Sequence, residues 1–415
     1  MSLKFFLIFY LTVFLSSHSF VGFGQKKVVF IILDGIPAAV LENTSTSNLD
    51  EIAKKGGYSR AYTGGIKGGY SETPTISAVG YNSLLTGTWA NKHNVWGNEI
   101  KEPNYNYWTI FRFLKEARPA SKIAIFSTWQ DNRTKLIGEE LSDTGFLKMD
   151  FSFDGFELDT VTYPHDSETQ YIQKIDNLVS YEAAYQLKNN GPDLSWVYLE
   201  YTDDIGHRYG DSPQLSAAVV LADEQVGRIY ESIRFREEKF GEDWMIIITT
   251  DHGRKAPDGK DHGGQSDRER ETWIVTNAQH LNEYFKNEQP AMVDILPTIV
   301  RFMDVDVPNA VLRELDGVSM IGELSIRQVK AEIQEEEVVL TWLPMESTGN
   351  VSISYAKTDQ FGQDGIVDNY LKIGDTELAL AEFRIPSKDL PTGKLKFWIQ
   401  GAKNGLGVWI FILPT

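Results

Sequence analysis

The sequence predicts an α/β fold, in which a sheet is flanked by helices, followed by a small C-terminal all-β, sandwich-like module. Two observations support this prediction. Over the first three quarters of the chain, short apolar runs alternate with helical patterns, which is typical of α/β proteins. From about residue 326, short alternating runs follow one another between polar turns, which favours a β-sandwich. We therefore assign residues 25–325 to an α/β domain and residues 326–415 to a β module.

The individual elements follow from periodicity and from glycine or proline boundaries. In the α/β domain, strands are expected at residues 27–33, 122–126, 195–201, 245–248 and 271–276. Helices are expected at residues 47–55, 77–87, 108–117, 170–189, 215–240 and 292–303. Weak periodicity from about residue 130 to the helix at 170 predicts an irregular insertion. Strands of the β module are expected at residues 338–342, 351–355, 377–385, 395–400 and 405–413.

Residues 1–24 are typical of a signal peptide. Lys4 provides a short positive region, and residues 5–15 form an apolar run that is too short for a comfortable membrane span. Gly22 and Gly24 place small residues before a cleavage point at Gln25. We therefore expect an exported protein, periplasmic or extracellular, with no stable membrane span in its mature form. An uncleaved anchor is the alternative.

Composition excludes several classes of partner and chemistry. A net charge of −18 argues against a nucleic-acid polymer as the partner, because such partners require basic surfaces. A small phosphate ester remains compatible with this charge if metal cations neutralise the site locally. The chain contains no cysteine, which excludes disulfides, thiolate metal ligands and a cysteine nucleophile. A transition metal would therefore bind to histidines and carboxylates.

Metal-type ligands follow three of the expected strands. Ligands of open α/β sheets bind outside the carboxyl ends of the strands, so we expect these side chains to converge. Carboxylates and imidazoles together suit zinc, with manganese as the alternative. The candidate metal ligands are Asp34, Asp203, His207, Asp251, His252 and His262, to which Ser77 adds a hydroxyl.

Ser77 is expected at the start of the helix at 77–87 and has two interpretations. A serine there commonly caps the helix, and its hydroxyl then satisfies backbone N–H groups. The same position also places a hydroxyl where free N–H groups and the helix dipole favour an anion. Two divalent ions roughly 3.5–4 Å apart can clamp the attacking and leaving oxygens of an in-line displacement at phosphorus. In such a site metal coordination, rather than a histidine base, activates the serine.

At these residues the chain resembles the alkaline phosphatase superfamily, and within it the nucleotide pyrophosphatase/phosphodiesterases, also called type I phosphodiesterases. The resemblance covers roughly residues 26–320 and implies an alkaline-phosphatase-like fold with two divalent ions. The first ion would bind to Asp203, His207 and His262, and the second to Asp34, Asp251, His252 and the nucleophile Ser77. It implies an enzyme that cleaves phosphodiester or pyrophosphate bonds through a phosphoryl-Ser77 intermediate.

Residues 77–98 carry the most specific part of the resemblance. Family members have, after the nucleophile, a helix that ends in Thr-Gly and then a His-Gly-Ile-x-Gly-Asn sequence. This chain has Thr86-Gly87 and then His93-Asn94-Val95-Trp96-Gly97-Asn98. The resemblance implies that Asn98 donates a hydrogen bond to a phosphoryl oxygen and stabilises the transition state. We expect Trp96, two residues earlier, to contact the substrate.

Other activities remain as alternatives. The short gap between His252 and His262 is similar to that of ethanolamine-phosphate transferases, so a phosphoethanolamine-type phosphotransferase or a phosphomonoesterase is the first alternative. A sulfatase would carry Pro and Arg two and four residues after its modified residue, where this chain has Val79 and Tyr81. A non-catalytic surface-binding protein would have lost at least one of the seven candidate ligands, and none is missing.

Overall fold

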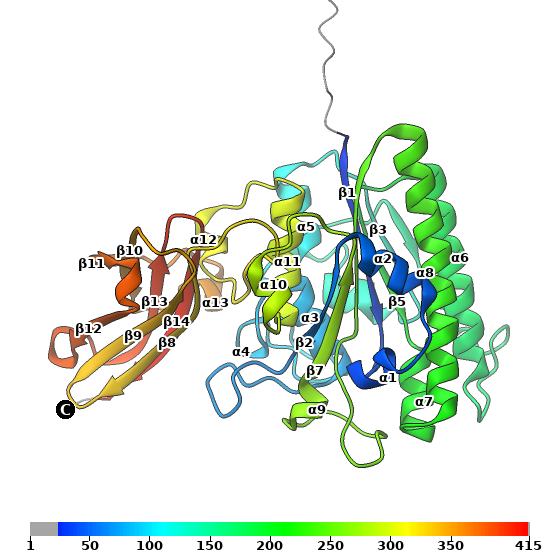
Figure 1. The fold of residues 1–415 in the computed structure, drawn as a ribbon, viewed down its shortest axis with the longest axis horizontal. Helices are drawn as coiled ribbons and strands as arrows, with labels where there is room; N and C mark the ends of the chain where they lie inside the picture. Colours follow the sequence, from blue (N-terminus) through cyan, green and yellow to red (C-terminus); the bar gives the residue numbers. More distant parts are fainter. Residues whose placement is uncertain (1–23, 414–415) are drawn as a thin grey trace, which may run out of the picture.

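The computed structural model describes residues 24–413 (Figure 1). A large sheet covered by helices on both faces is followed by a smaller part built mainly from antiparallel strands, which confirms the predicted fold class. The predicted signal peptide, residues 1–24, lies outside the described residues except for Gly24. Within the described range, no helix is both long and apolar enough to cross a membrane.

The central sheet is mainly parallel. Its strands are β1 (Lys26–Leu33), β2 (Gly57–Tyr62), β3 (Ile123–Ser127), β4 (Phe151–Phe153), β5 (Leu194–Leu199), β6 (Asp243–Thr249) and β7 (Glu271–Thr276). Their order is β2-β7-β6-β1-β5-β3-β4, and only β7 runs antiparallel to its neighbours. Because β5, β1 and β6 are adjacent and parallel, their carboxyl ends meet at one edge of the sheet.

Helices cover both faces of this sheet (Figure 1). On one face lie α1 (Ala38–Glu42), α2 (Ser47–Lys55), α6 (Gln170–Asn190) and α8 (Pro213–Phe240). On the other lie α3 (Ser77–Thr86), α5 (Ile110–Ala117), α10 (Glu283–Asn287) and α11 (Ile295–Phe302). β1 shows the consequence, since Phe30 packs into one core and the adjacent Ile31 into the other. A strand buried on both faces reads as a continuous apolar run, which is why the sequence predicts it so clearly.

Four short helices lie in the connections: α4 (Ala90–His93), α7 (Tyr201–Tyr209), α9 (Asp267–Arg270) and α12 (Asn309–Leu312). The strand expected at 195–201 ends at Leu199 instead, and α7, a helix that the sequence did not predict, begins at Tyr201. Polar residues on α7 that belong to the candidate site conceal its helical periodicity. β2 was also missed, since its small and polar residues give little apolar signal.

The expected irregular insertion contains regular structure. Residues Asn132–Ile137 form a π-helix, and β4 adds a parallel edge strand beside β3. Only three residues pair in this strand, too few for a period-two pattern to be visible in the sequence.

The C-terminal part consists of two antiparallel sheets. One has the order β11-β10-β13-β14 and the other β12-β9-β8. The elements are β8 (Ile326–Gln334), β9 (Glu337–Pro344), β10 (Asn350–Ala356), α13 (Gln360–Asp364), β11 (Leu371–Glu377), β12 (Glu382–Pro386), β13 (Gly393–Gln400) and β14 (Gly405–Ile412). Side chains of β9, β10 and β13 form one core, among them Leu340, Ile353 and Phe397. This arrangement is sandwich-like, as predicted.

Two strands of this module differ from expectation. β8 was missed because most of its residues after Arg327 are polar and lie partly or fully in solvent. The expected strand at 377–385 is broken by a 3-10 turn at Leu378–Leu380 and by Ala381, whose φ of 59° lies in the left-handed region. The residues on either side belong to β11 and β12, which lie in different sheets.

Candidate metal centre

The candidate ligands lie at the carboxyl ends of three adjacent strands. Asp34 follows β1 directly, and Asp251 follows β6 after a single residue. Strand β5, which lies between β1 and β3 in the sheet, leads into α7. On α7, Asp203 and His207 lie one helical turn apart on the same face. The sequence places these residues far apart, and the strand order β5-β1-β6 brings them together.

The first predicted set is compact. One ligand atom from each of Asp203, His207 and His262 lies within 4.8 Å of the others. His207 Nε2 is 3.2 Å from Asp203 Oδ2 and 3.1 Å from His262 Nε2. A carboxylate oxygen and two imidazole nitrogens thus converge on one point, which is the donor set of many zinc sites.

The second predicted set is centred on the buried imidazole of His252. His252 Nε2 lies 3.2 Å from Asp251 Oδ2 and 3.5 Å from Asp34 Oδ1. Asp203 also approaches this group, since its Oδ1 is 4.0 Å from His252 Nε2. Asp34, Asp203 and His252 accordingly form a second cluster of potential ligand atoms within 4.8 Å of one another. Asp203 is therefore close to both groups, which the sequence did not predict.

In Asp34 and in Asp251, one carboxylate oxygen accepts hydrogen bonds and the other oxygen has no partner among the described residues. Asp34 Oδ2 accepts hydrogen bonds from Tyr81 and from Tyr198, the latter at 2.7 Å. Asp251 Oδ1 accepts from the backbone N–H of Gly35 at 3.1 Å. Among the described residues, Asp34 Oδ1 and Asp251 Oδ2 are buried and have no hydrogen-bond partner. Unpaired buried carboxylate oxygens are costly, and a bound cation would satisfy both.

The imidazoles are oriented in a similar way. His252 Nδ1 is 2.9 Å from the carbonyl oxygen of Gly253, and His262 Nδ1 is 2.8 Å from that of Thr75. A carbonyl oxygen can only accept, so these contacts place the proton on Nδ1. The unprotonated Nε2 atoms then face the carboxylates, ready to bind a metal ion.

The protonation equilibria agree with this geometry. Burial, reinforced by Asp251 and Asp203, raises the pKa of Asp34 well above its ordinary value, and burial raises the pKa of Asp251 to about 7. Burial and the neighbouring His262 lower the pKa of His252 well below the ordinary range. Without a cation, therefore, the carboxyls tend to hold protons while His252 is neutral. The donor set fits a divalent metal ion, which would favour ionised carboxylates.

Ser77 is the first residue of α3, and its hydroxyl points to the second group. Ser77 Oγ lies 3.3 Å from His252 Nε2. The helix-cap interpretation is wrong for this serine, because Ile76 occupies the N-cap and no side chain caps the helix there. The hydroxyl is therefore available at the metal centre.

Of the two predicted substrate contacts, Asn98 and Trp96, the first lies beside the start of α3. Asn98 Oδ1 accepts a hydrogen bond of 3.0 Å from the backbone N–H of Ala78, so the amide group lies next to Ser77 in space. Trp96 is 47% exposed, and its indole N–H donates to Asn94 Oδ1 at 2.9 Å. The structure thus brings Asn98 close to the serine and leaves the Trp96 ring accessible.

Three functional neighbours were not recognised in the sequence. Arg254 is fully buried and pairs with Asp203, while Tyr81 and Tyr198 bind Asp34. The tyrosines read as ordinary core residues, because nothing in the local pattern distinguishes a buried hydroxyl that has a partner. Arg254 did offer a signal, since it follows Asp251-His252-Gly253 directly.

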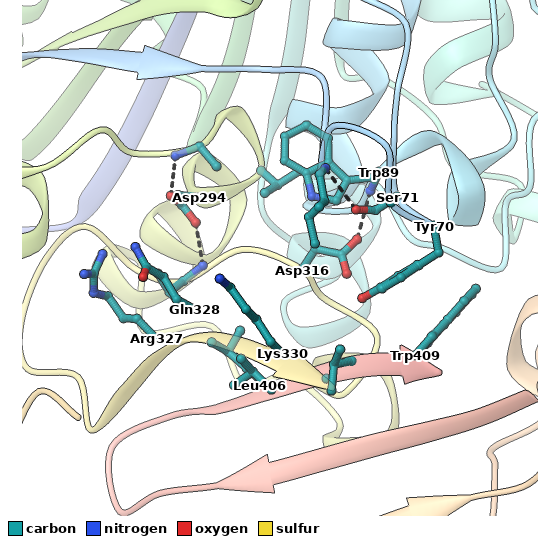
Figure 2. A pocket seen from close by; sticks show the side chains of 18 of the residues that line it. Tyr70, Ser71, Trp89, Asp294, Asp316, Arg327, Gln328, Lys330, Leu406 and Trp409 are labelled. Carbon is teal, nitrogen blue, oxygen red and sulfur yellow. Dashed lines mark hydrogen bonds between the residues drawn. The ribbon is translucent and has the colours of Figure 1, made fainter. Parts of the chain in front are cut away.

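A cavity of about 420 Å³ lies away from this centre, between the α/β domain and the β module (Figure 2). Tyr70, Trp89 and Trp409 form part of its wall, and Asp316 accepts a hydrogen bond of 2.9 Å from the backbone N–H of Trp89. None of the candidate ligands lines it. A search for a binding site based on cavities alone would therefore have indicated a different part of the molecule.

Parts of the chain are similar in sequence to known proteins. Residues 28–297 match the family model described as type I phosphodiesterase / nucleotide pyrophosphatase. GPI ethanolamine phosphate transferase 2 of Schizosaccharomyces pombe is 24% identical over 305 residues, which cover 68% of this chain and 37% of that protein. An ectonucleotide pyrophosphatase/phosphodiesterase of Caenorhabditis elegans is 22% identical over 242 residues, covering 57% of this chain and 27% of that protein. The chain thus spans well under half the length of these relatives.

The fold also has a solved counterpart. The structure of a 2-O GAG sulfatase superposes with a TM-score of 0.52 at 14% identity and covers 88% of this chain and 86% of that one. At this level of identity the similarity concerns the fold alone. It extends beyond the α/β domain, since the match covers most of both chains.

Proposed function

Because the chain belongs to the type I phosphodiesterase / nucleotide pyrophosphatase family, we propose that it hydrolyses phosphodiester or pyrophosphate bonds in a small phosphate ester, of nucleotide or headgroup type. One observation carries this proposal. Six potential metal ligands converge at the carboxyl ends of β5, β1 and β6, and Ser77 Oγ lies 3.3 Å from one of them.

We assign two divalent ions, zinc in the first place and manganese as the alternative. The first would bind to Asp203, His207 and His262, and the second to Asp34, Asp251, His252 and Ser77. Such ions lower the pKa of a bound hydroxyl and neutralise charge on a leaving oxygen. The buried unpaired oxygens of Asp34 and Asp251 support this assignment.

The protein's own side chains would supply the nucleophile and the groups that bind the substrate. Ser77 Oγ, deprotonated at the second site, forms a bond to phosphorus as the bond to the leaving oxygen breaks, which yields a phosphoryl-Ser77 intermediate. A water molecule then attacks phosphorus, and the serine oxygen leaves. The side-chain amide of Asn98 would donate a hydrogen bond to a phosphoryl oxygen at both stages. Trp96, exposed beside it, would contact the base, sugar or headgroup.

A diester is favoured over a monoester by charge. A monoester dianion usually requires a cationic clamp, and here the residue assigned to the phosphoryl oxygen is the neutral Asn98. The buried Arg254 does not fill this role, because its guanidinium is bonded to Asp203 and to backbone carbonyls.

A phosphoethanolamine-type phosphotransferase is the second candidate. In that reaction an acceptor hydroxyl, instead of water, would attack the phosphoryl-serine. The observation that favours it is the similarity to an ethanolamine phosphate transferase, together with the short loop from His252 to His262.

From the first 24 residues we also propose export to the periplasm or the extracellular space.

Hydrolysis rates of three substrates test the proposal. Protein from Gln25 onward, loaded with zinc, would be assayed on the p-nitrophenyl ester of thymidine 5′-monophosphate, on p-nitrophenyl phosphate and on p-nitrophenyl sulfate. We expect the diester to be cleaved fastest, and chelation or Ser77→Ala to lower its rate by about 10³-fold or more. Ser77→Thr is the matched control, because it keeps a hydroxyl and should retain activity. Faster monoester cleavage would contradict the diesterase assignment.

A further inference from the structure

Arg254 is a fully buried cation next to the metal centre, and all of its contacts join segments that carry ligands. Its Nε donates to the carbonyl oxygen of Gly35 at 2.8 Å, directly after Asp34. Its Nη1 donates to the carbonyl oxygen of Lys260 at 3.2 Å, two residues before His262. Its Nη2 donates to the carbonyl oxygen of Asp203 at 2.8 Å and also pairs with Asp203 Oδ1.

Two glycines leave room for this guanidinium. A Cβ atom at Gly206 would lie 2.1 Å from Arg254 Cζ, and one at Gly35 would lie 2.6 Å from Arg254 Nη2. Both distances are far below van der Waals contact, so a side chain at either position would displace the arginine. The turn after β1 and the helix α7 are thus both shaped to accept Arg254.

Because Arg254 pairs with only one oxygen of Asp203, the two oxygens of that carboxylate have different surroundings. Asp203 Oδ2 is 3.2 Å from His207 Nε2 and so belongs to the first group. Asp203 Oδ1 is 4.0 Å from His252 Nε2, the centre of the second group. Arg254 bonds to Oδ1, the oxygen that would otherwise serve the second group.

We propose that Arg254 is a positioning residue that assigns Asp203 to the first metal ion and holds the loop of His262 against it. This inference rests on the proposed two-metal function. With Oδ1 bonded to the guanidinium, only Oδ2 is open to a cation, and it faces His207 and His262. The second ion keeps Asp34, Asp251, His252 and Ser77. The carboxylates of Asp34 and Asp251 are held through their other oxygens, by two tyrosines and by the N–H of Gly35.

Substitution of Arg254 should therefore weaken one metal site and leave the other unchanged. Loss of a residue that orients metal ligands typically lowers metal affinity by 10–100-fold. We expect an effect of about that size at the first site. A role limited to protein stability would lower the melting temperature without separating the two affinities.

Titration calorimetry of the chelator-treated full chain with zinc, repeated with cobalt, tests this prediction. Arg254→Lys keeps the positive charge but cannot make the several hydrogen bonds of the planar guanidinium. Gly206→Ala keeps the arginine, but the added methyl group displaces its side chain. Both variants, and Arg254→Met if it folds, should bind one of two ions at least about tenfold more weakly. Arg268→Met is the matched control, since this arginine pairs with Asp211 on the neighbouring loop and contacts no candidate ligand.

A His207→Ala background identifies the affected site. There the first site is already lost, so adding Arg254→Lys should cause no further change in zinc affinity. Equal or tighter binding of both ions in Arg254→Lys and Gly206→Ala would overturn the inference. A wild-type chain that binds two ions but cleaves no phosphate ester would overturn the proposed function and leave the role of Arg254 standing.

Discussion

Among residues 24–413, two clusters of three carboxylates are largely buried, Asp359 being half-buried, and they differ in where the compensating positive charge comes from. In the metal centre, Asp34, Asp203 and Asp251 are at most 9% exposed, and Arg254 pairs with one of them only. In the other cluster, at the edge of the β module, Lys396 Nζ lies 2.6 Å from Glu314 and 2.8 Å from Asp368. It also lies 3.3 Å from Asp359.

The pKa values of two aspartates in each cluster diverge accordingly, whereas burial raises the pKa of Glu314 in the lysine cluster, and Arg254, against the effect of burial, lowers that of Asp203 in the other. Although burial opposes it, pairing with Lys394 and Lys396 lowers the pKa of Asp359 below its ordinary value, and Lys396 does the same for Asp368. In the metal centre the pKa values of Asp34 and Asp251 are raised instead. A cluster with its own lysine keeps its aspartates ionised without help. We propose that bound cations complete the cluster without one.

The largest expected effect is on catalysis. Asp251→Asn removes a ligand oxygen of the second site and should lower diester hydrolysis by about 10³-fold or more, while the chain remains folded. Steady-state kinetics with circular dichroism would measure both. The matched variant is Asp368→Asn in the lysine cluster, which should retain activity within a fewfold. Comparable losses of activity in the two variants would contradict the distinction between the clusters.

The next effect is on stability. Lys396→Met leaves Glu314 and Asp368 without this cation, while Asp359 keeps Lys394, and removing one partner of a buried pair costs about 3–5 kcal/mol. Urea unfolding should show this loss, with zinc stoichiometry unchanged. Lys388→Met, an exposed lysine of the same module, should change the unfolding free energy by less than about 0.5 kcal/mol. A smaller cost for Lys396→Met than for this control would show that the network is not stabilising.

Metal removal should affect only one cluster. At a free zinc concentration of 100 times the dissociation constant of each site, each bound ion stabilises the folded state by about 2.7 kcal/mol, and a chelator should remove this amount for each of the two ions. The loss caused by Lys396→Met should be the same with and without chelator, because the two clusters share no contacts. Urea titrations of the four states would measure both quantities. A strong dependence of the Lys396→Met effect on metal would indicate coupling.

The smallest expected effect is on the number of protons released when zinc binds. Since the pKa of Asp251 is about 7 in the metal-free chain, a proton competes with the ion below that pH. Asp34, whose pKa is also raised, contributes in the same direction, whereas His252 is already neutral. Zinc binding should therefore release about one proton or more at pH 6, and fewer above pH 8. Calorimetry in two buffers of different ionisation enthalpy would measure the release, and a value independent of pH would contradict these pKa shifts.

Much of the candidate site could be predicted because polar ligands interrupt apolar strands. Asp34 and Asp251 follow continuous apolar runs, where a carboxylate is conspicuous, and parallel strands place such residues at one edge. α7 was missed for the opposite reason, since its Asp203 and His207 face the site and replace the apolar residues that mark a helix. β2 and β8 were missed because small or solvent-exposed residues carry little hydrophobic signal.

The sequence by itself determined the fold class, the set of candidate ligands and the kind of chemistry such residues permit, since these depend on local periodicity and on residue type. Only the tertiary structure decided the partners across the chain. It placed Arg254 between Gly35 and Gly206, directed Tyr198 to Asp34, and brought Glu314 to Lys396, 82 residues away in the sequence. Such contacts depend on strand order and side-chain packing, which no local pattern encodes.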